Sequence, residues 1–125
     1  QMPVSAAPAD ARVYFIEPKK GQVFSFQEEK EIEIKFGLSG MELSPAGMAA
    51  PNSGHHHLLI NIDQLPNLNL PLPATDQVRH FGKGQTSTKI SLPLGKHRLQ
   101  LLLANHIHIP HSPAVMSDVI EIEVK

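Results

Sequence analysis

Two short segments of this chain are dense in histidine, a side chain that binds transition metals through its ring nitrogens. Residues 54–62 read G-H-H-H-L-L-I-N-I, so three consecutive imidazoles open an apolar stretch. Residues 105–111 read N-H-I-H-I-P-H and follow the most apolar run of the sequence. Neutral imidazoles suit Cu(II), Zn(II) and Ni(II). The sequence therefore predicts a metal site, provided that the fold brings the two segments together.

Side-chain direction narrows the choice of ligands. Along an extended chain alternate residues share a side, which pairs His55 with His57 and His106 with His108. His56 has the parity of the apolar residues that follow it, which is also the parity of a residue packed in the core. The predicted metal ligands are His55, His57, His106, His108 and His111, with His80 and His56 assisting. The alternative is a hydrogen-bonded histidine network that ties loops together.

The composition restricts which metal chemistry is available. The chain has no cysteine, which excludes disulfides, thiolate zinc sites, iron–sulfur clusters and cysteine nucleophiles. Copper is the expected metal, because nitrogen ligands bind Cu(II) more tightly than the other divalent ions; zinc and nickel are the alternatives. Three methionines in the connecting segments could add thioether ligands for Cu(I) or simply fill gaps. They are Met41, Met48 and Met116.

The charge balance gives no sign of a macromolecular partner. With 11 basic and 12 acidic residues the formal net charge is -1, so neither nucleic acid nor a charged membrane surface is indicated. The sequence also lacks an apolar run of the length that crosses a bilayer. A metal ion is the expected partner, and a protein partner is left unassigned.

Alternating hydrophobicity predicts an all-β fold. Residues 31–36 and 119–124 alternate charged and apolar side chains, and Leu99, Leu101 and Leu103 share one face of another strand. We expect an immunoglobulin-like Greek-key β-sandwich of about seven strands, without the cysteine bridge and tryptophan of antibody domains. The predicted strands cover residues 12–16, 23–26 (a short edge piece), 31–36, 55–62, about 68–74, 86–92, 97–104 and 118–125.

The domain organisation follows from this pattern. Residues 12–125 are predicted to form a single domain. Residues 1–11 are small and proline-bearing, and they read as a flexible lead of the kind that follows a removed export signal. We therefore expect an exported, soluble protein of the periplasm.

The predicted topology brings the two histidine segments together. Strands 55–62 and 97–104 would be antiparallel neighbours, so the start of one lies beside the end of the other. Opposed Cβ atoms are then about 4.5 to 5.5 Å apart, and imidazoles can share an ion at about 2.0 Å from each nitrogen. His80 precedes the predicted strand 86–92 and is expected at the same end of the sandwich. His97 falls at the opposite end and is expected to be a surface or turn residue.

Two other functions fit the sequence. One is a non-catalytic envelope or interaction module whose histidines are structural and whose binding surface is the edge formed by residues 65–73. The other is a metal-dependent hydrolase or oxidase that uses Asp118 or Glu42 as general base. Neither carboxylate has a spacing that marks it, so we do not expect an enzyme.

Several motifs together resemble an uncharacterised bacterial family, a domain of unknown function in exported, periplasmic proteins. The matching segments are F-G-L-S-G-M (36–41), S-G-H-H-H-L-L-I (53–60), L-P-L-P-A (70–74), H-F-G-K-G-Q-T (80–86), G-K-H-R-L-Q-L-L-L (95–103) and residues 106–117. The resemblance implies an immunoglobulin-like β domain and no established activity. One departure is Pro110-His111-Ser112-Pro113-Ala114, where similar sequences tend to read P-H-x-P-P.

Overall fold

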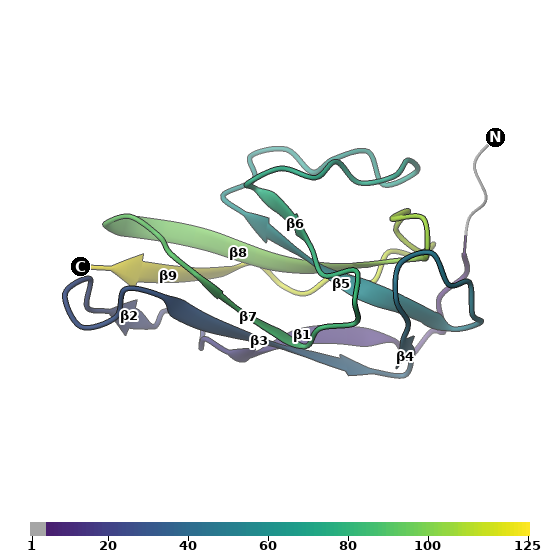
Figure 1. Ribbon diagram of the computed structural model, residues 1–125, viewed down its shortest axis with the longest axis horizontal. Coiled ribbons are helices and arrows are strands. Elements are labelled where there is room, and N and C mark those ends of the chain that lie inside the picture. The colour runs from purple at the N-terminus through teal and green to yellow at the C-terminus, as the bar shows by residue number, and fades with distance from the viewer. Residues whose placement is uncertain (1–4) are drawn as a thin grey trace.

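The computed structural model describes residues 5–125, which form nine strands and no helix (Figure 1). The strands are β1 (Arg12–Glu17), β2 (Val23–Phe24), β3 (Ile32–Ser39), β4 (Glu42–Leu43), β5 (Ser53–Ile60), β6 (Val78–His80), β7 (Ser87–Ile90), β8 (Gly95–Ala104) and β9 (Ile120–Val124). The all-β prediction is confirmed. With no helix in this range, the described part of the chain contains no helical segment able to cross a membrane.

The strands form two sheets that lie in two layers (Figure 1). The smaller sheet has the order β1-β3-β7, and the larger six-stranded sheet has the order β2-β9-β8-β5-β4, with β6 paired to β5. The predicted antiparallel pairing of the two central strands is confirmed, because His55 of β5 lies opposite Ala104 of β8. The start of β5 therefore lies beside the end of β8.

The main hydrophobic core lies between the two sheets. Alternate residues of β3 are buried, as predicted for Ile32, Ile34 and Phe36. The larger sheet contributes alternate side chains of β5, β8 and β9 to the same cluster. The predicted inward residues of the last two of these strands are all buried, namely Leu99, Leu101, Leu103, Ile120, Ile122 and Val124.

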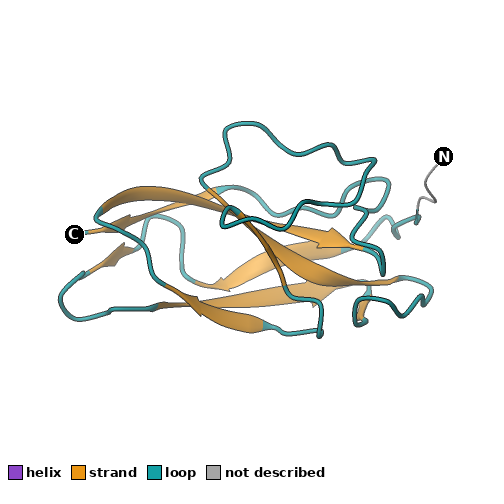
Figure 2. Ribbon diagram, turned by 45° about the horizontal axis from the view of Figure 1, so that its top comes forward, coloured by secondary structure: helices purple, strands orange, loops and turns teal. Residues whose placement is uncertain are grey.

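A second, smaller cluster covers the outer face of the larger sheet. Leu59 of β5 and Leu102 of β8 pack there against Leu72 and Val78. The irregular segment 62–77 arches over this face (Figure 2). All eight residues of β5 are consequently buried. Burial on both faces explains why the second half of the strand, Leu58-Leu59-Ile60, is continuously apolar rather than alternating.

The segment after β5 differs from the prediction of a strand near residues 68–74. No strand forms there, because Pro71 and Pro73 have no N–H to donate to a sheet. Strand β6 forms instead at residues 78–80, where a loop was expected, and β4 adds a short parallel pair beside the start of β5.

Part of the predicted N-terminal lead lies within the described residues. The Ser112 N–H donates to Ser5 O, and the Ala7 N–H donates to Ser112 O. Residues 5–7 therefore run alongside the segment that follows the second histidine cluster. Residues 1–4 of the predicted lead lie outside the described residues.

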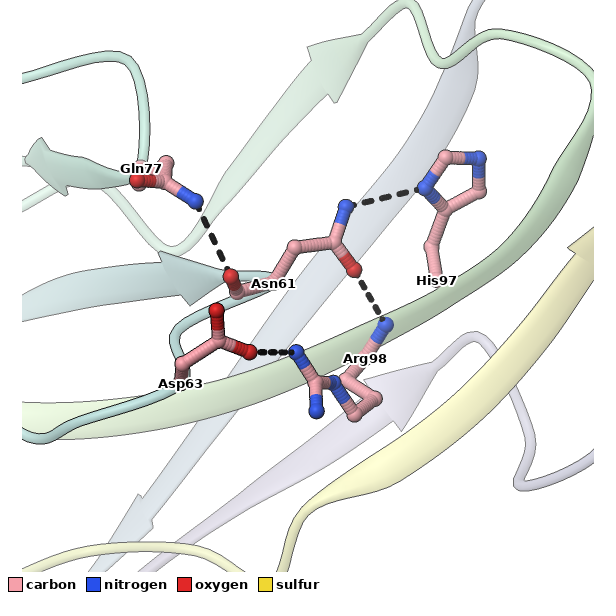
Figure 3. Close-up of polar contacts among 5 residues, drawn as sticks. All are labelled: Asn61, Asp63, Gln77, His97 and Arg98. Atoms are coloured by element: carbon pink, nitrogen blue, oxygen red, sulfur yellow. Dashed lines mark hydrogen bonds and ion pairs between the residues drawn. The ribbon is translucent and has the colours of Figure 1, made fainter.

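Strand β5 ends at Ile60, and the next residue, Asn61, ties it to β8 (Figure 3). Asn61 has a φ of +53°, a conformation that asparagine tolerates better than most residues. Its Oδ1 accepts from the Arg98 N–H at 2.8 Å, and its Nδ2 donates to His97 Nδ1 at 3.0 Å. His97 Nε2 in turn donates to Pro93 O. The expectation that His97 is a surface or turn residue was wrong: it is buried, and both ring nitrogens have partners.

Candidate metal centre

Two of the predicted ligands are placed by strand β5. His55 and His57 alternate with the residues that face the main core, so both rings project from the outer face of the larger sheet. Their neighbours across the sheet are Ala104 and Leu102 of β8, and His80 of β6 lies directly opposite His57. The rings of His55 and His57 are fully buried, with centroids 4.7 Å apart. The sheet register therefore fixes two imidazoles side by side and places a third next to them.

His108 comes from the loop after β8 and lies over these rings. Its Nδ1 is 3.1 Å from His55 Nε2 and 3.3 Å from His57 Nε2. The ring is edge-on to both, at interplanar angles of 87° and 88°. The two histidine segments predicted to meet thus do meet, at the outer face of the larger sheet.

His80 adds a fourth imidazole. Its Nδ1 is 3.1 Å from His108 Nδ1, while its Nε2 donates to Pro73 O at 2.8 Å. A neutral imidazole has one N–H, so the bond to the Pro73 carbonyl leaves the His80 Nδ1 lone pair free and directed at His108. A backbone carbonyl that fixes the tautomer in this way is the usual partner of a metal-binding histidine.

The possible N–H···N hydrogen bonds among these four rings cannot all form at once. His108 Nδ1 lies close to three other nitrogens but holds either one hydrogen or one lone pair, so it completes one N–H···N bond. If His55 and His57 both carry their hydrogen on Nε2, the two N–H groups compete for the single lone pair of His108 Nδ1. A cation among the four nitrogens would instead use every lone pair directed at it, with the hydrogens of His55 and His57 on their Nδ1 atoms, which are buried and have no partner.

The spacing also suits a metal ion. The ligand nitrogens of His55, His57 and His108 all lie within 4.8 Å of one another. Four ligands arranged tetrahedrally at about 2.0 Å from an ion are about 3.3 Å apart. The three approaches to His108 Nδ1, at 3.1, 3.3 and 3.1 Å, are close to that value.

Burial keeps the rings in the form that binds metals. Desolvation is the largest cause that lowers the pKa of His55 from 6.5 to about 4, and proximity to His108 and His80 adds to it. Desolvation likewise lowers the pKa of His57 to about 2. The pKa of His108 is also lowered, by burial and then by His80. Neutral imidazoles therefore persist well below pH 7.

Three other predicted ligands lie elsewhere. His56 projects from the opposite face of β5 into the main core, where its ring packs against Phe36 with centroids 5.0 Å apart. Neither of its nitrogens has a hydrogen-bond partner. His111 is buried beside Gly54, and its Nε2 donates to Ser53 O. His106 is half-buried and borders a cavity of about 240 Å³ together with Met48 and other residues.

The expected pairing of His106 with His108 assumed an extended chain after β8. The chain instead turns sharply: the His108 N–H donates to Asn105 O, and His108 has a φ of +65°. This turn places the ring of His108 next to those of His55 and His57, whereas His106 lines a separate cavity. Asparagine is common in such turns, which is the one sequence signal that pointed to this outcome.

No predicted methionine or carboxylate joins the site within residues 5–125. Met116 pairs with Leu102 and packs on the second cluster, and Met41 packs against the main core. Met48 is 62% exposed. The only group of histidine and acidic residues there with metal-binding spacing is made of histidines, so Asp118 and Glu42 are outside it.

Sequence reasoning missed two supporting groups. The Pro73 carbonyl holds His80, and the Asn105 side chain holds the loop of His108. The first leaves no trace in a sequence, because every residue has a carbonyl. The second is visible only as an asparagine before a histidine pair.

Fold and site together define an all-β domain with a cluster of imidazoles, two of them fully buried, on one sheet. The chain belongs to a family of domains of unknown function, DUF4399, whose family model matches residues 34–125. That range holds all the histidines of the cluster. Neither the curated proteins nor the solved structures that were searched include a match to this chain.

Proposed function

We propose that this protein binds one transition-metal ion through His55 Nε2, His57 Nε2 and His108 Nδ1, with His80 Nδ1 as the fourth nitrogen. The observation that carries the proposal is the approach of three ring nitrogens to His108 Nδ1 at 3.1 to 3.3 Å, beside the fully buried rings of His55 and His57, where one His108 nitrogen cannot complete a hydrogen bond with all three. A metal held this way would be sequestered or delivered rather than used in catalysis, because the group with metal-ligand spacing contains no carboxylate.

Copper is the metal that we propose. The ligands are all imidazoles, and for such nitrogen sites Cu(II) is bound most tightly among the divalent first-row ions. The near-equal distances of three nitrogens from His108 Nδ1 are also close to the ligand separation of a tetrahedral Zn(II) site. Copper and zinc are therefore the two metals to compare first.

We further infer that the sandwich is immunoglobulin-like and that the protein works in the periplasm. The order β1-β3-β7 matches strands A, B and E of that fold, and the run β9-β8-β5 matches G, F and C. The parallel pairing of β2 with β9 is consistent with a short first-strand segment that has crossed to the second sheet. The periplasmic location rests on the small, proline-bearing composition of residues 1–11, and the absence of cysteine is compatible with it.

Calorimetric titration of metal-free protein with Cu(II) and with Zn(II) tests the proposal. The parent should bind one equivalent, and a His55→Ala/His108→Ala variant should lose this binding. His106→Ala is the matched control, because it removes an imidazole from the same loop but outside the group, and it should bind like the parent. An absence of stoichiometric binding by the parent would leave the structural-histidine interaction module as the better account.

A further inference from the structure

The loop that carries His108 is closed by one side chain. Asn105 Oδ1 accepts hydrogen bonds from the N–H groups of Ile107 and Ile109, both at 3.0 Å. The backbone of Asn105 also accepts from the His108 N–H and donates to Ile109 O, each at 2.9 Å. Asn105 is 3% exposed, so these bonds are shielded from water. One residue thus holds the next four in a fixed turn.

This turn forces His108 into a backbone conformation that it would otherwise avoid. Its φ of +65° lies in the left-handed region, which is unfavourable for a residue with a side chain. Hydrogen bonds on both sides hold the conformation: the Asn105 bonds on one side, and on the other the His108 carbonyl, which accepts from the Leu72 N–H at 2.8 Å. Without Asn105 Oδ1, the loop would lose two of the bonds that offset the strain.

We propose that Asn105 is a positioning residue for the metal centre, acting through His108. The inference rests on the proposed function, and it goes further by assigning a role to a side chain that does not contact the metal. His55 and His57 are set by the sheet register, and Pro73 sets the tautomer of His80. His108 is the ligand that depends on a loop, and Asn105 shapes that loop. Removal of Asn105 Oδ1 should therefore cost the site one imidazole.

Asn105 also makes a second, separable contact. Its Nδ2 donates to Ser5 Oγ at 3.0 Å, which links the loop to residues 5–7. Ser5→Ala removes this contact and leaves the two bonds to Oδ1 in place. That variant is the matched control, because it reports on the link to the N-terminal segment without touching the turn.

The experiment combines Asn105 and His108 variants in a cycle, with copper affinity as the readout. Asn105→Ala should weaken Cu(II) binding by about tenfold or more, the usual loss when a group that orients a metal ligand is removed. In a His108→Ala background the same substitution should change the affinity less than about twofold, because its target is already absent. Ser5→Ala should bind like the parent.

A spectroscopic readout separates positioning from general destabilisation. The Cu(II) electron paramagnetic resonance spectrum of Asn105→Ala should show one fewer coordinated imidazole than the parent and should match that of His108→Ala. Asn105→Asp, which keeps an oxygen acceptor, should restore the parent spectrum. If Asn105→Ala does not fold, Asn105→Gln replaces it, because the longer side chain moves the acceptor away from the turn.

The outcomes are distinguishable. A parent that binds no copper overturns the proposed function and this inference with it. A parent that binds copper, together with an Asn105→Ala protein of unchanged affinity and spectrum, overturns only the role of Asn105. The same holds if Asn105→Ala weakens binding equally with and without His108, because the residue would then act on the fold as a whole.

Discussion

The buried His56 should make the metal-free protein sensitive to acid, and replacing it should relieve part of that sensitivity. His56 lies in the main core, fully buried, and burial lowers its pKa from 6.5 to about 4. The unfolded chain therefore takes up a proton on this ring before the folded protein does. The contribution of the neutral His56 ring to the free energy of unfolding is fully present above pH 6.5. It is lost as the pH falls from there toward 4.

The size of this effect follows from the two pKa values. Between pH 7.5 and pH 5.5 the His56 ring should lower the free energy of unfolding by about 1 kcal/mol. His56→Leu keeps a buried side chain of similar size and removes the titration. It also removes a ring whose two nitrogens have no partner, so at pH 7.5 the variant should be at least as stable as the parent.

Urea unfolding of both proteins at the two pH values, with chelator present, measures the difference. The free energy of unfolding of the parent should fall by about 1 kcal/mol more than that of His56→Leu on going to pH 5.5, with similar denaturant slopes for both. The other histidines are common to the two proteins and cancel in the comparison. Equal losses for parent and variant would refute the assignment of His56 to a dry, unpaired core position.

Three further predictions concern β5 and the metal site. Gly54→Ala should destabilise the protein by about 1–3 kcal/mol in urea unfolding, because the added Cβ would lie 2.5 Å from the Ala104 carbonyl oxygen; a neutral effect would contradict the close packing there. Asn61→Gly should lower the free energy of unfolding by about 1–2 kcal/mol, because two side-chain hydrogen bonds are lost. Asn61→Ala should lower it further, because alanine tolerates the positive φ less well than glycine. Thermal melts in which the alanine variant is more stable than the glycine variant would contradict this. Metal affinity should fall little between pH 7.5 and 6. If three ligand rings had the ordinary pKa of 6.5, the affinity would instead fall roughly 50-fold over this range. A fall of that size in calorimetric titrations would show that the rings titrate like exposed ones.

The parts of the fold that could be predicted are those encoded by short-range alternation. The charged and apolar residues of β3 and β9 alternate with period two, and both strands formed with the expected face inward. The leucine run of β8 was harder to interpret, because Leu102 faces a second cluster on the outer surface of the sheet. That cluster depends on residues 62–77 folding over the strand, which no local pattern encodes.

The site was predictable to the extent that topology decides it. Pairing of β5 with β8 brings the start of one to the end of the other, which joins His55 and His57 to the loop of His108 and, through β6, to His80. The division of the remaining rings was not predictable. It depends on the Asn105 turn, which separates His106 from His108, and on a carbonyl at Ser53 that holds His111.

X-ray absorption spectroscopy of stoichiometrically loaded protein tests the central claim most directly. For copper or zinc we predict three or four imidazole nitrogens at about 2.0 Å and no sulfur. His57→Ala should lower that number by one, and His106→Ala should leave it unchanged. A nearest shell made mainly of oxygen, or an imidazole number that His57→Ala does not alter, would contradict the assignment of the metal to this histidine cluster.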